Sequence, residues 1–369
     1  MDPKDLAPAN VRAIAPYIPG KPIGETAREI GIAEADILKM ASNESPIGPS
    51  PRAVAAIRGA LDGLHYYPDA FELRAALSRK LGVAEDTLIL GNGSNDVLEL
   101  AARAFMVRED SAVYSQYAFL VYPLVVQALG AQHIVVPAKD YGNDLDAMAR
   151  AVRADTKIVF LANPNNPTGT FNPWEEIRAF MKRVPSRVLV VLDEAYGEYL
   201  PDGMQSTTHR WVGEFPNLIV SRTLSKAYGL AGLRIGYAVA DPGVADLMNR
   251  VRQPFNTNSL ALAAACAALD DHEFIARSRA VNSAGLVQLA EGFWRLGLEY
   301  IPSRANFITV RVGDAAAVYR DLLAQGVIVR PVANYGMPEH LRVTVGLPEH
   351  NARLLAALEK AMARVKAGA

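Results

Sequence analysis

The feature that most constrains the fold is an unbroken apolar run at residues 188–192. Five apolar residues without alternation predict a strand that is buried on both faces, which is typical of a parallel sheet. Similar short runs alternate with helical stretches, so the sequence predicts an α/β fold with a largely parallel sheet covered by helices on both faces. We expect its strands near residues 87–90, 112–115, 134–136, 157–161, 188–192, 218–220 and 235–239.

The pattern changes after about residue 255, where an Ala-rich helix leads to strands near 307–311, 327–330 and 341–345. This change predicts a smaller α+β domain. We therefore expect an N-terminal arm with part of the small domain (1–48), a large domain (49–255) and a small C-terminal domain (256–369). Ser50 and Pro51 predict a capped helix that runs to about residue 61, and a final helix is expected at about 348–365.

A hydroxyl-rich turn follows the expected strand at 218–220 and carries Lys226 into apolar and aromatic surroundings. Desolvation favours a neutral amine, which can form a Schiff base. Thr223, Ser225 and Arg234 add two hydroxyls and a fixed cation, a set that suits a phosphate monoester. An amine beside a phosphate site is what pyridoxal phosphate (PLP) requires. Taken alone, however, Lys226 could be a surface lysine after a strand.

Asp193 closes the apolar run at 188–192, so it lies at the carboxyl end of a strand, where open α/β sheets bind ligands. Such a carboxylate can pair with a pyridinium nitrogen. A helix cap is the structural alternative. A magnesium-binding acid of a nucleotide hydrolase is a third possibility, but the sequence contains no G-x-x-x-x-G-K-[ST] loop.

Two further loops follow strands. Residues 163–170 contain two Asn-Pro steps, and Asn166 could donate its amide to a phenolic oxygen, although an ordinary turn fits equally well. Residues 91–96 form a glycine turn that opens a helix and could hold one phosphate. Asp96 replaces the third glycine of a dinucleotide fingerprint, so a plain strand-to-helix turn is the alternative there.

Together these four motifs resemble a fold-type-I PLP aminotransferase over almost the whole chain. Segments 16–23, 41–51, 252–259 and 335–346 are similar to the histidinol-phosphate aminotransferase branch. The resemblance implies a large domain with a mostly parallel seven-stranded sheet between helices, plus a smaller α+β domain.

The resemblance also implies roles for individual residues. For the cofactor, it implies that Lys226 holds PLP, Asp193 binds the ring nitrogen, Asn166 and Tyr196 flank the phenolic oxygen, Tyr117 stacks on the ring, and Gly93, Ser94, Asn95, Thr223, Ser225 and Arg234 hold the phosphate. Tyr67 would reach the phosphate of the neighbouring subunit's cofactor. For the substrate, it implies Arg342 at the carboxylate, with Tyr17, Asn43 and Arg330 also in contact. Arg330 could instead be a surface arginine at a strand end, and Gln116 departs from the family pattern.

The implied reaction is transamination between L-histidinol phosphate and 2-oxoglutarate, in histidine biosynthesis. An aromatic amino-acid (Phe/Tyr) aminotransferase is the alternative within the class. A PLP decarboxylase of a phosphorylated amino acid and a non-catalytic PLP-binding regulator are the alternatives outside it. The Tyr67 role implies a homodimer.

The composition limits the kinds of partner and the compartment that we expect for this chain. A net charge of −1 gives no basic footprint for nucleic acid. The single cysteine, Cys266, allows no disulfide within the chain, which fits a reducing cytoplasm. No apolar run is long enough to span a membrane, and the six histidines show no metal-binding spacing, so we expect a cytoplasmic enzyme without a metal.

Overall fold

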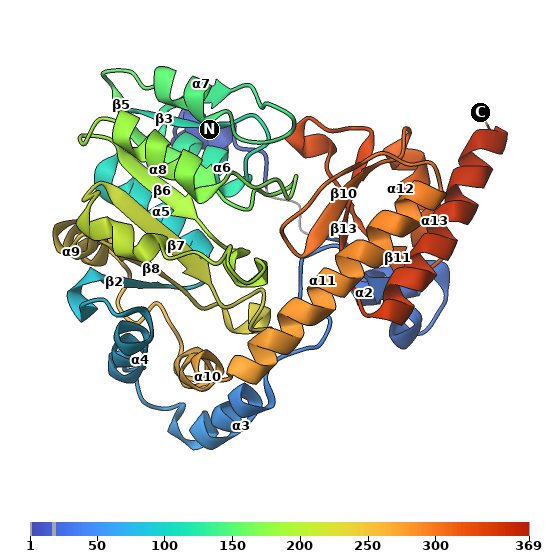
Figure 1. The fold of residues 1–369 in the computed structure, drawn as a ribbon, viewed down its shortest axis with the longest axis horizontal. Coiled ribbons are helices and arrows are strands. Elements are labelled where there is room, and N and C mark those ends of the chain that lie inside the picture. The colour runs from blue at the N-terminus through green and yellow to red at the C-terminus, as the bar shows by residue number, and fades with distance from the viewer. Residues whose placement is uncertain (1, 17–19, 369) are drawn as a thin grey trace.

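The computed structural model describes residues 2–16 and 20–368, and its largest element is a seven-stranded sheet (Figure 1). The strands are β2 (Leu88–Gly91), β3 (Ser111–Ser115), β4 (Gln132–Val136), β5 (Thr156–Ala162), β6 (Leu189–Asp193), β7 (Leu218–Thr223) and β8 (Gly236–Ala240). Their order is β2-β8-β7-β6-β5-β3-β4, and β8 runs antiparallel to both of its neighbours while the other pairs are parallel. The predicted α/β fold with a mostly parallel sheet is confirmed.

The register of the central strands brings their carboxyl ends together. Asp193 at the end of β6 is paired with Ala162 on β5 and with Ser221 on β7. All five residues of β6 are buried, as the apolar run predicted. The turns that follow β5, β6 and β7 therefore start from one edge of the sheet.

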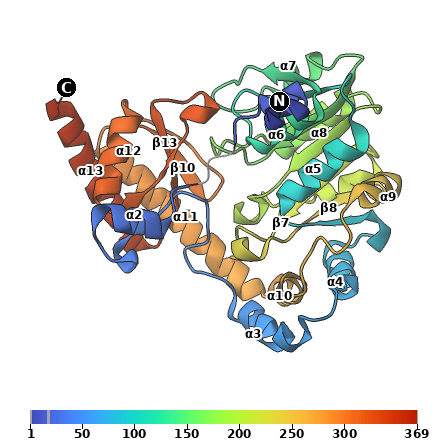
Figure 2. The same ribbon diagram turned by 180° about the vertical axis from the view of Figure 1, so that it is seen from behind.

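Helices cover both faces of this sheet (Figures 1 and 2). On one face, α5 (Ser94–Phe105), α6 (Val121–Leu129) and α9 (Pro242–Val251) share an apolar core with the strands. On the other face, the core is shared with α4 (Phe71–Leu81), α7 (Leu145–Arg150), α8 (Trp174–Arg183) and α10 (Ser259–Leu269). This two-sided burial explains why the strands are apolar without alternation.

A second, smaller sheet has the order β12-β13-β10-β9 and is antiparallel. Its strands are β9 (Tyr300–Ile301), β10 (Phe307–Arg311), β12 (Arg330–Pro331) and β13 (His340–Thr344), and α11 (His272–Arg295), α12 (Ala315–Ala324) and α13 (Pro348–Gly368) lie against it. The strand expected at 327–330 is divided into β11 (Val327–Ile328) and β12. The strand β9 was not predicted.

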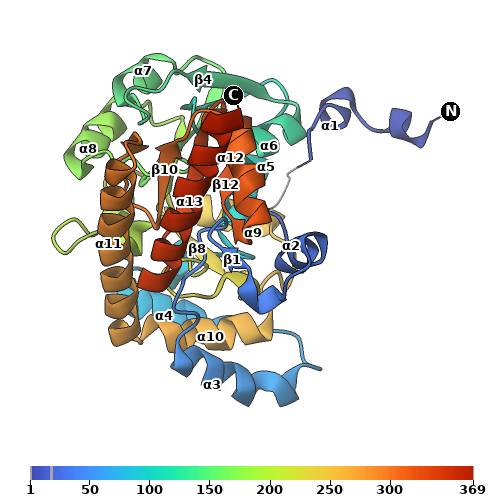
Figure 3. The same cartoon turned by 90° about the vertical axis from the view of Figure 1, so that its right-hand side faces the viewer.

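The N-terminal part of the chain joins this smaller unit. The strand β1 (Leu38–Lys39) pairs in parallel with β11, and α2 (Ile23–Ile30) lies beside them (Figure 3). The short helix α1 (Ala9–Arg12) instead reaches α6, where Asn10 Nδ2 donates to the carbonyls of Gln127 and Ala128 at 3.0 Å each. Short 3₁₀ turns lie at Pro3–Leu6, Glu34–Asp36, Leu61–Gly63, Glu85–Thr87, Gly197–Tyr199, Thr208–Gly213, Ala231–Leu233 and Ala333–Tyr335.

The connection between the two units runs through α10 and α11 (Figure 1). The helix α10 packs on α3 (Pro51–Ala60) and α4, which belong with the large sheet, and α11 then passes to the smaller sheet. The Ser50 side chain accepts hydrogen bonds from the backbone of Arg52 and Ala53, which confirms the predicted cap of α3. The division at residues 48 and 255 stays a prediction.

Candidate functional site

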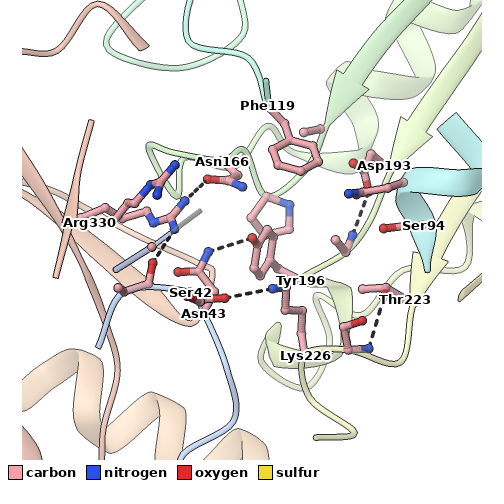
Figure 4. A pocket seen from close by; sticks show the side chains of 18 of the residues that line it. Ser42, Asn43, Ser94, Phe119, Asn166, Asp193, Tyr196, Thr223, Lys226 and Arg330 are labelled. Carbon is pink, nitrogen blue, oxygen red and sulfur yellow. Dashed lines mark hydrogen bonds between the residues drawn. The ribbon is translucent and has the colours of Figure 1, made fainter. Parts of the chain in front are cut away.

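One pocket collects most of the residues that the sequence singled out (Figure 4). It lies where the turns after β5, β6 and β7 meet the N-terminal segment and the smaller sheet. The predicted residues in its wall are Asn43, Ser94, Asn95, Asn166, Asp193, Tyr196, Thr223, Ser225, Lys226, Arg234, Arg330 and Arg342. Gly20, Ala41, Ser42, Phe119, Ala162, Pro164, Ala195 and Tyr335 complete it.

Lys226 projects into this pocket from the turn after β7 (Figure 4). Its Nζ donates to the carbonyl of Ser42 at 3.3 Å. Burial, reinforced by the positive charge of Arg342, lowers the pKa of Lys226 to about 8. The amine is therefore far more often neutral near neutral pH than that of an ordinary lysine, and the side chain is half-buried in the pocket wall.

Asp193 also lines the pocket and is only 4% exposed. Burial raises the pKa of Asp193 to about 6, although hydrogen bonds from Tyr122 and the backbone of Ala195 lower it. The Tyr122 hydroxyl donates to Oδ2 at 2.9 Å, and the Ala195 N–H donates to Oδ1 at 3.3 Å. A carboxylate has about four lone-pair positions, so capacity remains for a cationic N–H from the pocket.

The glycine turn before α5 forms a cradle that only glycine allows. Gly93 has φ 82°, and a Cβ there would lie 2.6 Å from Nη2 of Arg234. A Cβ on Gly236 would lie 2.6 Å from the backbone N of Ser94. Arg234 Nη1 also donates to the Ser225 hydroxyl at 3.4 Å. A helix N-terminus, a guanidinium and hydroxyls thus surround one space, a donor set that fits a phosphate monoester.

A hydrogen-bonded group lines the side of the pocket nearest the smaller sheet. Asn43 Nδ2 donates to the Tyr196 hydroxyl at 2.9 Å. Arg342 donates from Nη1 to Asn166 Oδ1 at 2.6 Å and from Nη2 to the carbonyl of Ala41 at 2.9 Å. These bonds join the turns after β5 and β6 to β13 and to the N-terminal segment.

Two arginines lie side by side in this group. Arg330 on β12 is the register partner of Arg342 on β13, and the two are 7% and 6% exposed. The interpretation of Arg330 as a surface residue is therefore wrong. Among the residues that the structure describes, none accepts a hydrogen bond from the buried Nε of Arg342. Two neighbouring guanidiniums concentrate positive charge in this part of the pocket wall, and Arg342 keeps an unused N–H donor, an arrangement that suits an anionic group.

Tyr17 lies outside the described residues. Two other predicted residues, Tyr67 and Tyr117, are not part of the pocket wall. Tyr67 is 80% exposed and stacks on Phe255 with ring centroids 4.5 Å apart, away from the pocket. Tyr117 stacks on Tyr141 instead of lining the pocket.

Phe119 occupies the pocket wall where Tyr117 was expected. The reason is the course of the turn after β3: the carbonyl of Tyr117 accepts from Asn165 Nδ2 at 2.8 Å, and the side chain of Gln116 accepts from the backbone of Ala138 at 3.2 Å. Residues 116 and 117 are held by these contacts and are not part of the pocket wall. Ser42, Phe119, Tyr122 and Tyr335 were missed, because the sequence around an isolated aromatic or serine residue does not indicate which neighbour its side chain will face.

The described ranges, 2–16 and 20–368, contain no group of three or more His, Cys, Asp or Glu side chains placed to hold a metal ion. In the same ranges, no helix is both long and apolar enough to cross a bilayer.

The fold and the site define an aminotransferase of fold type I. The sequence model of the family "Aminotransferase class I and II" matches residues 35–358, and the chain belongs to this family.

Within this family, the chain is similar to several proteins named histidinol-phosphate aminotransferase. The chain is 59% identical to histidinol-phosphate aminotransferase 1 of Thiobacillus denitrificans, over 97% of this chain and 94% of that protein. It is 60% identical to histidinol-phosphate aminotransferase 1 of Cupriavidus pinatubonensis, over 97% and 96%. The crystal structure of histidinol-phosphate aminotransferase from Sinorhizobium meliloti, in complex with pyridoxal-5′-phosphate, superposes with a TM-score of 0.88 at 29% identity and 97% coverage of both chains.

Proposed function

We propose that this chain catalyses the PLP-dependent transfer of an amino group between L-histidinol phosphate and 2-oxoglutarate, giving imidazole acetol phosphate and L-glutamate. The observation that carries the proposal is the pair of buried arginines, Arg330 and Arg342, in the same pocket as Lys226. This arrangement offers an amine for the chemistry and paired cations for substrates that each carry an anionic group. Relatives that match almost the whole chain at 56–60% identity carry the name of this activity.

The pocket residues match the needs of PLP one by one. Lys226 would hold the cofactor covalently, Asp193 would face its ring nitrogen, and Asn166 and Tyr196 would flank its phenolic oxygen. The phosphate would lie in the cradle formed by Gly93, Ser94, Asn95, Thr223, Ser225 and Arg234. In place of Tyr117, we propose Phe119 as the aromatic side chain that packs on the ring, because Phe119 lies in the pocket wall.

Bound PLP supplies an aldehyde that captures the substrate amine and a ring that takes up the electron pair left when the Cα proton departs. Lys226 removes that proton, since its lowered pKa leaves a neutral Nζ available as a base. Asp193 stabilises a protonated ring nitrogen by its negative charge. Tyr196, which accepts a hydrogen bond from Asn43, and Asn166, which accepts one from Arg342, would hold the group at its phenolic oxygen.

The two arginines divide the work of substrate binding. Arg342 would bind the carboxylate of glutamate or 2-oxoglutarate next to the reacting carbon. Histidinol phosphate has no carboxylate, so its phosphate would use one of the two guanidiniums. Asn43 and Tyr17 would complete the substrate side. Phenylalanine and tyrosine are the alternative substrates, because Phe119 and Tyr335 in the wall also suit a flat ring without a phosphate.

We also propose a homodimer in the cytoplasm. The support is a group of exposed apolar side chains near Tyr67: Leu61, Leu64, Tyr66, Tyr67, Phe71 and Phe255. A second copy of the chain would cover this surface and bring Tyr67 to its partner's pocket. The single cysteine is compatible with a reducing compartment.

A half-reaction titration tests the substrate. The purified, PLP-loaded protein is mixed in turn with histidinol phosphate, phenylalanine and tyrosine, and the loss of the cofactor's visible absorbance is followed. We expect the fastest change with histidinol phosphate. A clear preference for phenylalanine would replace the substrate and keep the reaction class. Release of carbon dioxide without any requirement for 2-oxoglutarate would identify a decarboxylase instead.

A further inference from the structure

A fully buried tyrosine lies directly behind the wall of the pocket. Tyr122, in the first turn of α6, is 1% exposed and is not itself part of the wall. Its hydroxyl donates to Asp193 Oδ2 at 2.9 Å. Its ring stacks on Phe160 of β5 with centroids 4.8 Å apart and planes 9° apart. The hydroxyl therefore has one fixed position, set by the packing of the ring.

Tyr122 also contacts Phe119 through its backbone and its ring. The backbone N–H of Tyr122 donates to the carbonyl of Phe119 at 3.0 Å, and the two rings meet edge to face at 6.0 Å. Phe119 and Asp193 both line the pocket. One residue outside the pocket thus contacts two residues of its wall.

We propose that Tyr122 is a positioning residue that holds the Asp193 carboxylate in its orientation toward the pocket and keeps it ionised for a protonated ring nitrogen. The inference rests on the proposed function, because the ring nitrogen belongs to PLP. The Tyr122 phenol can only donate to an ionised carboxylate, since a carboxylate has no proton to give. Burial raises the pKa of Tyr122 well above its ordinary value, so the phenol keeps its proton at any working pH.

The other groups around Asp193 do not duplicate this role. Lys226 in the turn after β7 attracts the carboxylate charge through space, and Tyr196 in the turn after β6 donates nothing to it. Glu194, the next residue, repels it. The register partners of Asp193, Ala162 on β5 and Ser221 on β7, carry no charge. Tyr122 is the side-chain donor to Asp193 among the described residues, and Ala195 N–H is the backbone donor.

A matched pair of variants tests the proposal. Tyr122→Phe removes one hydroxyl and keeps the stacked ring. Tyr114→Phe is the control, because Tyr114 lies in the same apolar core and its hydroxyl meets a neutral partner, His133 Nδ1, at 2.7 Å. The ligand is pyridoxamine 5′-phosphate, which contains the ring nitrogen and the phosphate but no aldehyde for Lys226. Its dissociation constant is measured by calorimetry on the full chain, freed of cofactor, from pH 5 to 9.

In the parent protein, affinity should fall below about pH 6 as Asp193 gains a proton. In Tyr122→Phe, that midpoint should move upward by about one pH unit, because a lost hydrogen bond to a charged group weakens the ionised form by about tenfold or more. Tyr114→Phe should leave the midpoint unchanged. In an Asp193→Asn background, Tyr122→Phe should have no further effect on affinity.

An unchanged midpoint in Tyr122→Phe, or an equal movement in Tyr114→Phe, would overturn the inference. Borohydride reduction of the PLP-loaded parent protein, followed by peptide mass spectrometry, tests the proposed function separately. If the peptide with Lys226 gains the mass of the cofactor and the midpoint does not move, the inference alone fails. If no adduct forms at Lys226, the proposed function fails and the inference falls with it.

Discussion

Two neighbouring acids at the end of β6 have opposite surroundings. Asp193 faces the pocket, has two hydrogen-bond donors and a raised pKa. Glu194 is fully buried on the other side and accepts hydrogen bonds from Ser206 Oγ at 2.8 Å, from Arg222 Nη2 at 2.6 Å and from Thr208 Oγ1. Consecutive residues of a strand point to opposite faces, which explains how one sequence step separates the two environments.

A basic residue lies near each of these acids, and the two basic residues differ in the same way. Arg222 on β7 forms ion pairs with Glu194 and Glu198. Burial alone would lower the pKa of Arg222, but the two carboxylates raise it, so the guanidinium stays charged. Lys226, four residues further on, has no carboxylate partner within ion-pair distance among the described residues, and its pKa falls. A buried charge with a full set of partners stabilises the fold, whereas a buried group with few partners retains reactivity. We call Glu194, Glu198, Ser206, Thr208 and Arg222 the structural cluster.

The largest expected effect concerns Lys226. Lys226→Ala should lower kcat by about 10⁴-fold or more, because both the covalent attachment and the base at Cα are lost. The urea midpoint of the cofactor-free protein should not fall. Lys80→Ala is the matched control: Lys80 on α4 is also partly buried, has a pKa lowered by burial and donates to a backbone carbonyl, that of Leu269, but it does not line the pocket. Comparable losses of kcat in the two variants would show that the effect is not specific to Lys226.

Substitutions of the two acids should give the next largest effects. Glu194→Gln should lower the free energy of unfolding by about 3 kcal/mol, because Arg222 loses half of its buried counter-charge. Asp193→Asn should leave the stability of the cofactor-free protein unchanged or raise it by up to about 2 kcal/mol above pH 7, because it removes a desolvated charge. In activity the order reverses: Asp193→Asn should lower kcat by about 100-fold or more. Urea unfolding and steady-state kinetics on both variants check this, and a stability loss in Asp193→Asn equal to that in Glu194→Gln would refute the comparison.

The pH dependence of stability should show the same difference. Lys226 has a folded pKa of about 8, below that of the unfolded chain, so the unfolded state binds more protons above pH 8. The penalty of the buried ammonium is therefore fully present below about pH 8 and is relieved as the pH rises from 8 toward 10.

Asp193 has the opposite effect on stability at lower pH, because its folded pKa of about 6 lies above that of the unfolded chain. Stability should fall as the pH rises from about 4 to 6, since the buried carboxylate loses its proton there. Urea midpoints of the cofactor-free protein at pH 7, 8, 9 and 10 should rise less in Lys226→Met than in the parent protein. An identical rise in both would show that Lys226 is not the group responsible.

The sequence predicted the parts of the molecule in which local pattern decides structure. All seven strands of the large sheet were expected, because each contains a short apolar run bounded by turns. Lys226, Asp193 and Asn166 could be placed because each follows such a strand directly. Arg330 could not be assigned, since its burial depends on pairing with β13. The structural cluster was also not foreseen, because its members lie on three separate turns and strands.

Substitutions of Tyr117 and Phe119 should give the smallest effect. They also test most directly a position that the sequence could not assign. Both lie in the turn after β3, and which ring lines the pocket depends on tertiary contacts of that turn, among them those with Asn165 and Ala138. Phe119→Leu should raise the dissociation constant for pyridoxamine 5′-phosphate by about three- to tenfold, since it removes an aromatic contact while keeping apolar volume. Tyr117→Leu should change it by less than about twofold, because the Tyr117 ring packs on Tyr141 outside the pocket. The opposite ranking in a titration would restore the assignment that the sequence suggested.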